Sequence, residues 1–200
     1  MDNVAGGYDP HVELAKAAIR AYTERGARVR AEAGGITCSD GQPCPSPVRD
    51  YTRLLDKRAG VFVSIKKRGA LRGCIGTISP IRASIAEEIA ENAVNACSRD
   101  PRFEPVVPAE LDDLTVSVDV LSDAEPVDSA ADLDPKRYGV IVSRGYRRGL
   151  LLPNLEGVDT VEYQIGIALS KAGINPSERF DLERFEVVRH ETGGSMRGED

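Results

Sequence analysis

The chain has 200 residues, of which 41% are hydrophobic, and its formal net charge at pH 7 is −6. This length and composition suffice for one domain with a sizeable core, or for two closely packed lobes. The acidic balance argues against general electrostatic binding to nucleic acid or to an anionic membrane. No apolar run approaches the roughly 20 residues of a membrane-spanning helix, and the first residues lack a signal-peptide pattern. We therefore expect a cytoplasmic protein without a membrane partner.

The first quarter of the chain is predicted to be a helix followed by a loop. Residues 1–9 are expected to be flexible. From His11 to about Val29, apolar side chains recur at helical spacing. Gly34-Gly35 ends this pattern, and the segment Thr37–Pro47, with three prolines and two cysteines, is predicted to be a loop.

The two cysteines of this loop do not indicate a metal site. Five residues separate Cys38 from Cys44, which is wider than the usual spacing of paired zinc ligands. A complete ligand set would need residues that are distant in the sequence, such as Cys74. The chain's four cysteines also do not indicate a disulfide framework, because the cytosol keeps thiols reduced. We predict no metal and no cofactor.

A β-hairpin with an unusual second strand follows the loop. Gly60–Lys66 alternates apolar side chains with others, Lys67-Arg68-Gly69 supplies a turn, and the second strand is Leu71-Arg72-Gly73-Cys74-Ile75-Gly76-Thr77. Since side chains alternate between the faces of a strand, Arg72 and Cys74 are expected on one face, where the cation would favour the thiolate. Gly73 and Gly76 indicate a bulge, or a place where a ligand or another backbone comes close. The structural alternative is that Cys74 is a small buried side chain.

The hairpin leads into a predicted long helix. Ser79-Pro80 is a favourable helix start, the buried stripe includes Cys97, and the helix ends before Pro101 because the residue preceding a proline avoids helical torsions. Asp100 is expected to cap or turn the chain. Arg99 and Arg102 either reach the hairpin and bind an anion, or lie solvated at the helix end.

The rest of the chain contains strands, a second hairpin and a third helix. Helices and hairpins segregate and do not alternate as βαβ units, so the predicted fold is α+β with a largely antiparallel sheet and flanking helices. Residues 191–200 are predicted to be a disordered tail. In chain order, the expected elements are a strand at Leu114–Val120, an acidic connection at 123–135, a hairpin of Tyr138–Ser143 with Arg148–Leu152, a helix from the capping pair Asp159 and Glu162 to Gly173, and a last strand at Phe185 and Val187 with His190 near its end.

Several of these segments resemble the motifs of the AMMECR-one domain family. The signature hexapeptide is matched by Leu71-Arg72-Gly73-Cys74-Ile75-Gly76, and further motifs by Asn95–Phe103, Glu110–Ser122 and Gly149–Pro153. The chain is most similar to the prokaryotic type, such as protein A of the AmmeMemoRadiSam system. The resemblance runs from about Pro10 to Val188 and implies one domain at 10–190, with an α+β fold of two unequal, intertwined lobes. It also implies a genetic association with a Memo-type protein and a radical-SAM protein, but no established reaction.

Three functions of different classes remain open. The first is a binding or accessory module that acts with Memo-type and radical-SAM partners and uses the Leu71–Gly76 face for a partner or a small anionic ligand. The second is an enzyme with Cys74 as catalytic nucleophile, Arg72 as anion binder, and Asp100 or His190 transferring protons. The third is a nucleic-acid contact, which the acidic net charge disfavours. The residues of that contact would be Arg68, Arg72, Arg99 and Arg102. The candidate site residues are Arg72, Gly73, Cys74, Gly76, Asp100 and Arg102.

Overall fold

The structure is a computed structural model that describes residues 8–44, 46, 50–192 and 196. The chain divides into two compact units of unequal size, one of residues 1–120 with 189–200 and the other of residues 121–188. The termini predicted to be flexible, 1–9 and 191–200, lie mostly outside the described residues. Within them, Asp9 caps a helix, Glu191 ends a strand, and Met196 is buried and donates its backbone N–H to Leu114.

The first unit begins with helix α1, Pro10–Arg25. Its N-cap Asp9 accepts a hydrogen bond from the His11 N–H, and Gly26 ends the helix in the left-handed conformation at φ 68°. The prediction that this helix continues to Val29 is therefore wrong. Val29 instead opens strand β1, Val29–Glu32, which pairs with β2, Gly35–Cys38, so part of the predicted loop is a hairpin. Cys38 and Cys44 form a disulfide, although no disulfide was expected.

The sheet of this unit has the strand order β10-β5-β3-β4. Strand β3 pairs antiparallel with both β4 and β5. The predicted hairpin is present, and its turn residues Arg68 and Gly69 have φ angles of 51° and 85°, as expected of a type I′ turn. The strands are β3 at Val61–Lys67, β4 at Ala70–Gly76, β5 at Leu114–Leu121 and β10 at Val187–Glu191.

The long helix α3 spans Ile85–Ser98 and begins later than predicted. Its N-cap is Ser84, which accepts a hydrogen bond from the Glu87 N–H, whereas Ile81 is 65% exposed and lies outside the helix. The predicted end before Pro101 is correct. A short helix α2, Thr52–Leu55, precedes the hairpin, and a 3-10 helix η1, Pro108–Asp113, precedes β5.

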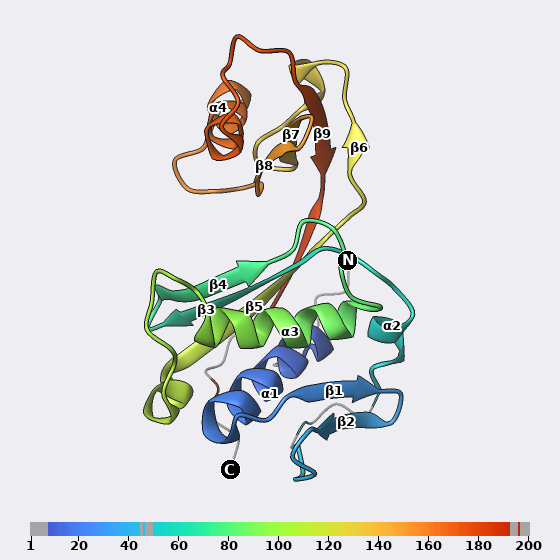
Figure 1. The fold of residues 1–200 in the computed structure, drawn as a ribbon, viewed down its shortest axis with the longest axis vertical. Helices are drawn as coiled ribbons and strands as arrows, with labels where there is room; N and C mark the ends of the chain where they lie inside the picture. Colours follow the sequence, from blue (N-terminus) through green and yellow to red (C-terminus); the bar gives the residue numbers. More distant parts are fainter. Residues whose placement is uncertain (1–7, 45, 47–49, 193–195, 197–200) are drawn as a thin grey trace. The chain divides into compact units, whose positions relative to one another are not determined.

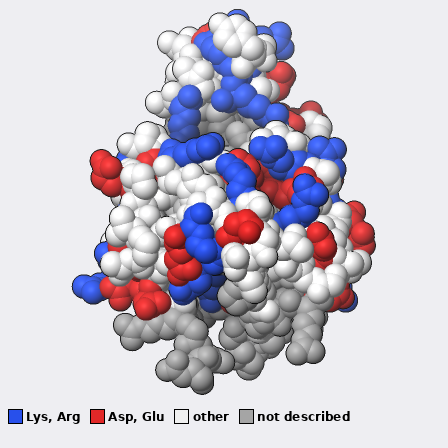
Figure 2. All heavy atoms as spheres, turned by 60° about the horizontal axis from the view of Figure 1, so that its bottom comes forward, with Lys and Arg blue, Asp and Glu red and all other residues white. Residues whose placement is uncertain are grey.

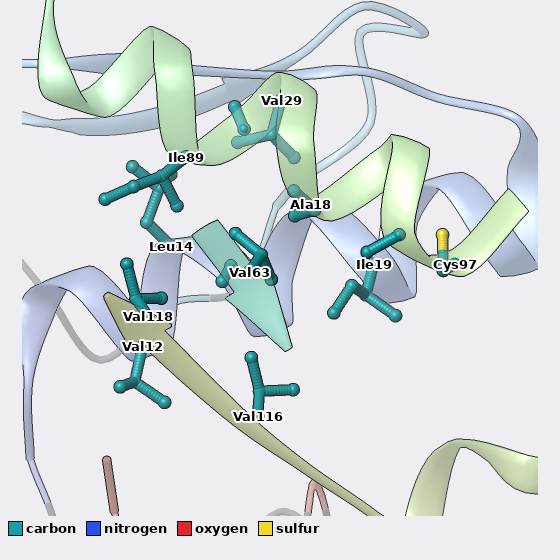
Figure 3. Packing of buried hydrophobic residues seen from close by; sticks show 14 of the residues in the cluster. Val12, Leu14, Ala18, Ile19, Val29, Val63, Ile89, Cys97, Val116 and Val118 are labelled. Carbon is teal, nitrogen blue, oxygen red and sulfur yellow. The ribbon is translucent and has the colours of Figure 1, made fainter. Parts of the chain in front are cut away.

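Helices α1 and α3 pack side by side and cover one face of the sheet (Figure 1). Figure 3 shows apolar side chains of both helices meeting those of β3 and β5. The pattern along β3 places Val61, Val63 and Ile65 in this core, while Phe62, Ser64 and Lys66 alternate with them. The sheet therefore has an apolar face towards the helices and a largely polar face opposite.

The second unit has its own sheet and core. The strand order is β6-β9-β7-β8, with antiparallel pairs, and helix α4 packs on β7 and β8. Helix α4 starts after N-cap Thr160 and ends at Gly173, with φ 63°, as predicted for its C-cap. The elements are β6 at Glu125–Pro126, η2 at Ala130–Asp132, β7 at Gly139–Arg144, β8 at Arg147–Leu151, α4 at Val161–Ala172 and β9 at Asp181–Phe185.

The predicted α+β class with antiparallel strands is confirmed. The predicted last strand is instead two strands, because β9 ends at Phe185 and β10 begins at Val187. Among the described residues, no helix combines the length and the apolar character that crossing a membrane requires.

Candidate functional site

Strand β4, which carries the hexapeptide, lies at one edge of its sheet. Its outward-facing backbone at Cys74 is paired by side chains from the segment after α3. The Cys74 N–H donates to Asp100 Oδ2 at 2.8 Å, and Arg102 Nη2 donates to the Cys74 carbonyl at 3.3 Å. Arg102 also binds both carboxylate oxygens of Asp100, at 2.9 and 2.6 Å. These two residues cover the sheet edge where an unpaired strand would otherwise expose its backbone.

Asp100 is well suited to this position because it is 4% exposed and surrounded by donors. The hydrogen bond from Arg102 holds the pKa of its carboxyl well below the ordinary value, against the opposing effect of burial. The carboxylate therefore stays charged and accepts hydrogen bonds from the Cys74 N–H and from Arg102. Of the two arginines for which contact with the hairpin was one alternative, Arg102 reaches it, whereas Arg99 donates to Asn95 of helix α3. Asp100, expected only to cap or turn the chain, also contacts the hairpin.

The expectation that Arg72 lies beside the Cys74 thiol is wrong. The register shifts between Ile65 and Lys66, which is a β-bulge at Arg72. The Arg72 guanidinium binds Glu110 through Nε–Oε1 at 3.1 Å and Nη2–Oε2 at 2.8 Å, and its Nη1 donates to the Glu104 carbonyl at 2.8 Å. Arg72, expected to bind an anion, thus recognises a carboxylate at two points, but this carboxylate belongs to the chain itself.

The two glycines of the signature are explained by packing. A Cβ at Gly73 would lie 2.2 Å from the Ala96 carbonyl oxygen in α3, so the helix backbone can approach β4 only because the side chain is absent. A Cβ at Gly76 would lie 2.3 Å from the Phe62 ring. Of the alternatives that the sequence left open, a bulge and a close backbone approach are both present on this strand.

The Cys74 thiol lies on the polar face of the sheet. Ser64, its cross-strand partner, donates from Oγ to Cys74 Sγ at 3.2 Å. On the same face, Asp119 of β5 is 2% exposed and binds Arg189 of β10 at 2.7 and 2.8 Å. The hydrogen bond with Asp119 raises the pKa of Arg189, and the hydrogen bond with Asp100 raises the pKa of Arg102. Arg189 is thus held on the same face as the thiol by Asp119, and Arg102 contacts the backbone carbonyl of Cys74.

Cys97 is a core residue, as predicted. It is 3% exposed on the buried side of α3, and burial raises the pKa of its thiol to about 11. Cys74 is only partly buried. The two free cysteines therefore differ in access to solvent.

The other polar residues singled out in the sequence have partners elsewhere. His190 Nδ1 lies 2.7 Å from Asp9, and the His190 ring stacks on His11. His190 therefore contacts Asp9 and His11, and not Cys74, for which it was proposed to transfer protons. Together Asp9, His11 and His190 are a group of donor side chains that can hold a metal ion.

The arginines of the nucleic-acid hypothesis are largely paired with acids. Arg68 binds Asp113 at 2.8 Å, Arg72 binds Glu110, and Arg102 binds Asp100. On the face drawn in Figure 2, Lys and Arg lie interspersed with Asp and Glu. This pairing reduces the positive charge that these arginines present to a phosphate backbone.

Sequence reasoning missed several residues that shape this site. Glu110 holds Arg72, Ser64 contacts the thiol, and Asp119 orients Arg189. The alternation along β3 and β5 places Ser64 and Asp119 on the polar face, so this signal was present in the sequence. The pairing with Arg189 was not visible, because 70 residues separate it from Asp119.

The fold and the site define an α+β protein of two units in which a cysteine-containing edge strand is held by carboxylate and guanidinium groups. The sequence profile of the AMMECR1 family matches residues 12–192, and the chain belongs to this family. The resemblance stated from the motifs is thereby confirmed.

Relatives extend across bacteria and archaea. The chain is 47% identical to Protein CA_C1420 of Clostridium acetobutylicum over 182 residues, which are 91% of this chain and 36% of that protein. It thus spans about a third of the length of that relative. A protein of Thermotoga maritima is 56% identical over 140 residues, covering 68% of this chain and 80% of that one. The crystal structure of the uncharacterized protein PH0010 from Pyrococcus horikoshii is similar with a TM-score of 0.75 and 29% identity, covering 92% of this chain and 91% of that one.

Proposed function

We propose that the protein is a binding or accessory module that acts in the cytosol with Memo-type and radical-SAM partner proteins. The signature strand Leu71–Gly76 supplies the recognition surface, and a small anionic ligand or an acidic partner segment binds there. The association with these partners rests on the family resemblance. The observation that carries the binding role is the geometry around the partly buried Cys74 thiol on the polar sheet face. Half-exposed Arg102 donates to the Cys74 carbonyl, and half-exposed Arg189 is held on the same face by Asp119.

The two guanidinium groups are held in place before any ligand arrives. Arg102 and Arg189 each bind a carboxylate that is 2% exposed at its side chain, while 54% of each arginine side chain remains exposed. In both residues the carboxylate engages Nε and Nη2, and among the described residues no hydrogen bond engages Nη1. A fixed guanidinium with a spare donor favours recognition of a carboxylate or phosphate, because little side-chain entropy is lost on binding.

The enzyme alternative has less support. A cysteine nucleophile is activated by a neighbouring base or by a group that lowers its pKa. In the described chain the side chain hydrogen-bonded to Cys74 Sγ is the Ser64 hydroxyl, and Arg72, the cation expected beside the thiol, binds Glu110. Asp100 accepts hydrogen bonds from the Cys74 backbone and Arg102, and His190 is bound to Asp9. The residues proposed to transfer protons are thus engaged in other contacts.

The proposal is tested by measuring, with biolayer interferometry, how tightly the protein binds purified Memo-type and radical-SAM proteins from the same organism. Ser117→Glu adds bulk and negative charge on the polar face, opposite Ser64. Thr37→Glu makes a matched change at an exposed position of strand β2. We expect the first variant to weaken partner binding at least tenfold and the second to leave it unchanged. Absence of binding by the wild type, or equal binding by both variants, contradicts the proposal.

A further inference from the structure

A cluster of three potential ligands lies where α1 begins and β10 ends. Asp9 Oδ1 is 2.9 Å from His11 Nδ1, and Asp9 Oδ2 is 2.7 Å from His190 Nδ1. The two imidazole rings stack with their centroids 3.6 Å apart and their planes at 22°. The cluster joins residues 181 positions apart in the sequence, so no local motif reveals it.

We propose that Asp9, His11 and His190 form a binding site for a divalent transition-metal ion that prefers imidazole, such as Zn²⁺ or Ni²⁺. Each residue offers one ligand atom, and the three atoms lie within 4.8 Å of one another. Two imidazoles and one carboxylate are a common ligand set for such ions, and they leave coordination positions open for water or another ligand. The hard oxygen-seeking ions Mg²⁺ and Ca²⁺ do not favour this set.

A bound ion requires only a modest rearrangement of the three side chains. Ligand atoms at about 2.1 Å from one metal lie roughly 3.0 to 3.4 Å apart. The short carboxylate–imidazole distances of 2.9 and 2.7 Å run to different oxygens of Asp9, and the three ligand atoms, which lie within 4.8 Å of one another, have to close to this range around one ion. The side chains are between 17% and 26% exposed, so an ion can reach them from solvent while the surrounding protein restricts their motion.

Two local electrostatic effects on a bound cation oppose each other. The positive end of the α1 dipole opposes a cation near the first turn of that helix. Asp9 supplies a full negative charge at the same point. The site thus presents an ionised carboxylate between two imidazoles.

An ion at this site would link the start of α1 to the end of β10. Asp9, His11 and His190 all belong to the first unit, so metal binding should stabilise that unit. The prediction of no metal was argued from the spacing of the cysteines, because the sequence alone does not bring His11 and His190 together. This site is independent of the partner-binding role proposed above.

The chain contains only two histidines, so NMR of the ¹⁵N-labelled, untagged protein observes both imidazoles directly. Titration of the EDTA-treated wild type with Zn²⁺ should perturb the nitrogen signals of both rings and saturate at one ion per chain. The thermal midpoint should rise in the same titration, because the ion binds the folded state. Zn²⁺ that leaves both imidazole signals unchanged overturns the proposal, and this test needs no variant.

Calorimetric titration of variants with Zn²⁺ shows whether the ion binds to these histidines or to other surface groups. Asparagine can still donate a hydrogen bond to Asp9, so His11→Asn and His190→Asn remove the metal ligand while conserving the structural contact. Each should weaken Zn²⁺ binding at least tenfold. Glu191→Gln, next to His190 in the sequence, and Cys74→Ser are matched controls that should bind Zn²⁺ as the wild type does. Binding lost in the controls, or retained in both histidine variants, contradicts the assignment.

Discussion

Arg72 and Glu110 form a two-point ion pair that joins the bulge in the signature strand to the 3-10 helix η1. Both side chains are mostly buried, 15% and 14% exposed. Lys67 adds a third hydrogen bond to the same carboxylate at 2.9 Å. The most prominent charge in the hexapeptide therefore holds the strand in place, and the surface near Cys74 depends on Arg102 and Arg189 instead.

The Arg72 contacts predict a loss of stability in Arg72→Lys. A lysine cannot reproduce the fork that engages both Glu110 oxygens and the Glu104 carbonyl. We expect the free energy of unfolding in urea to fall by about 1–3 kcal/mol. Arg68→Lys is the control, because Arg68 is 79% exposed and its pair with Asp113 should contribute little. Equal stability of Arg72→Lys and wild type would show that the pair is not structural.

Glu110 should make the stability depend on acid pH. The hydrogen bond from Arg72 lowers the pKa of Glu110 to about 2 in the folded state, whereas an unfolded glutamate titrates near 4.3. Because the folded pKa is the lower one, the stabilisation is present above about pH 4.3 and is lost as the pH falls towards 2. We expect this group to contribute roughly 2 kcal/mol, allowing for solvent screening. Urea unfolding of Glu110→Gln should show a shallower decline over this interval; an identical decline in both proteins would refute the assignment.

Gly73→Ala should be severely destabilising. Its Cβ would collide with the Ala96 carbonyl of α3, and neither backbone can move without separating the helix from the strand. We expect a loss of about 3 kcal/mol or more in thermal or urea unfolding. Gly166→Ala in α4 is the control for which we expect a gain in stability. Among the described residues, no heavy atom outside its chain neighbours and the surrounding helix backbone lies within 4 Å of the added Cβ, so alanine there should add roughly 0.5–1 kcal/mol. A folded, fully stable Gly73→Ala protein would contradict the packing explanation.

The hairpin, the α4 C-cap and the α+β class could be predicted because each depends on local signals. Turn residues at Arg68-Gly69 and alternation along β3 suffice for the hairpin. The start of α3 was misplaced because Ser79-Pro80 is also a favourable start. The actual N-cap Ser84 had an equally local signal, a glutamate at capping-box spacing, which was overlooked. A buried carboxylate, Glu88, accepts the backbone N–H groups of Ile81 and Arg82 and keeps that segment out of the helix.

For the site residues too, local signals could be predicted from the sequence and long-range contacts could not. Position in a strand identified Cys74 as a candidate, but it placed Arg72 on the wrong side because a bulge changes the alternation. The contacts that define the site join residues far apart in the sequence, such as Cys74 with Asp100 and Asp119 with Arg189. A single sequence contains no signal for such pairs, since they depend on how the strands and helices pack.

The disulfide between Cys38 and Cys44 should contribute to stability under oxidising conditions. It closes a short loop after β2, for which the loss of chain entropy in the unfolded state corresponds to about 2 kcal/mol. Reduction should lower the urea midpoint by a matching amount. The double variant Cys38→Ser with Cys44→Ser should be equally destabilised and insensitive to reductant. A midpoint unaffected by reductant in the wild type would contradict the bond's contribution.

The accessibility of Cys74 is tested most directly by iodoacetamide labelling of the native protein, read by site-resolved mass spectrometry with and without the Memo-type or radical-SAM partner. Cys97, buried and with a raised pKa, serves as the internal reference. We predict that Cys74 labels at least tenfold faster than Cys97 in the free protein, and that a bound partner slows Cys74 at least fivefold. Labelling of Cys74 that is no faster than that of Cys97, or that a bound partner leaves unchanged, would contradict the recognition role of the signature face.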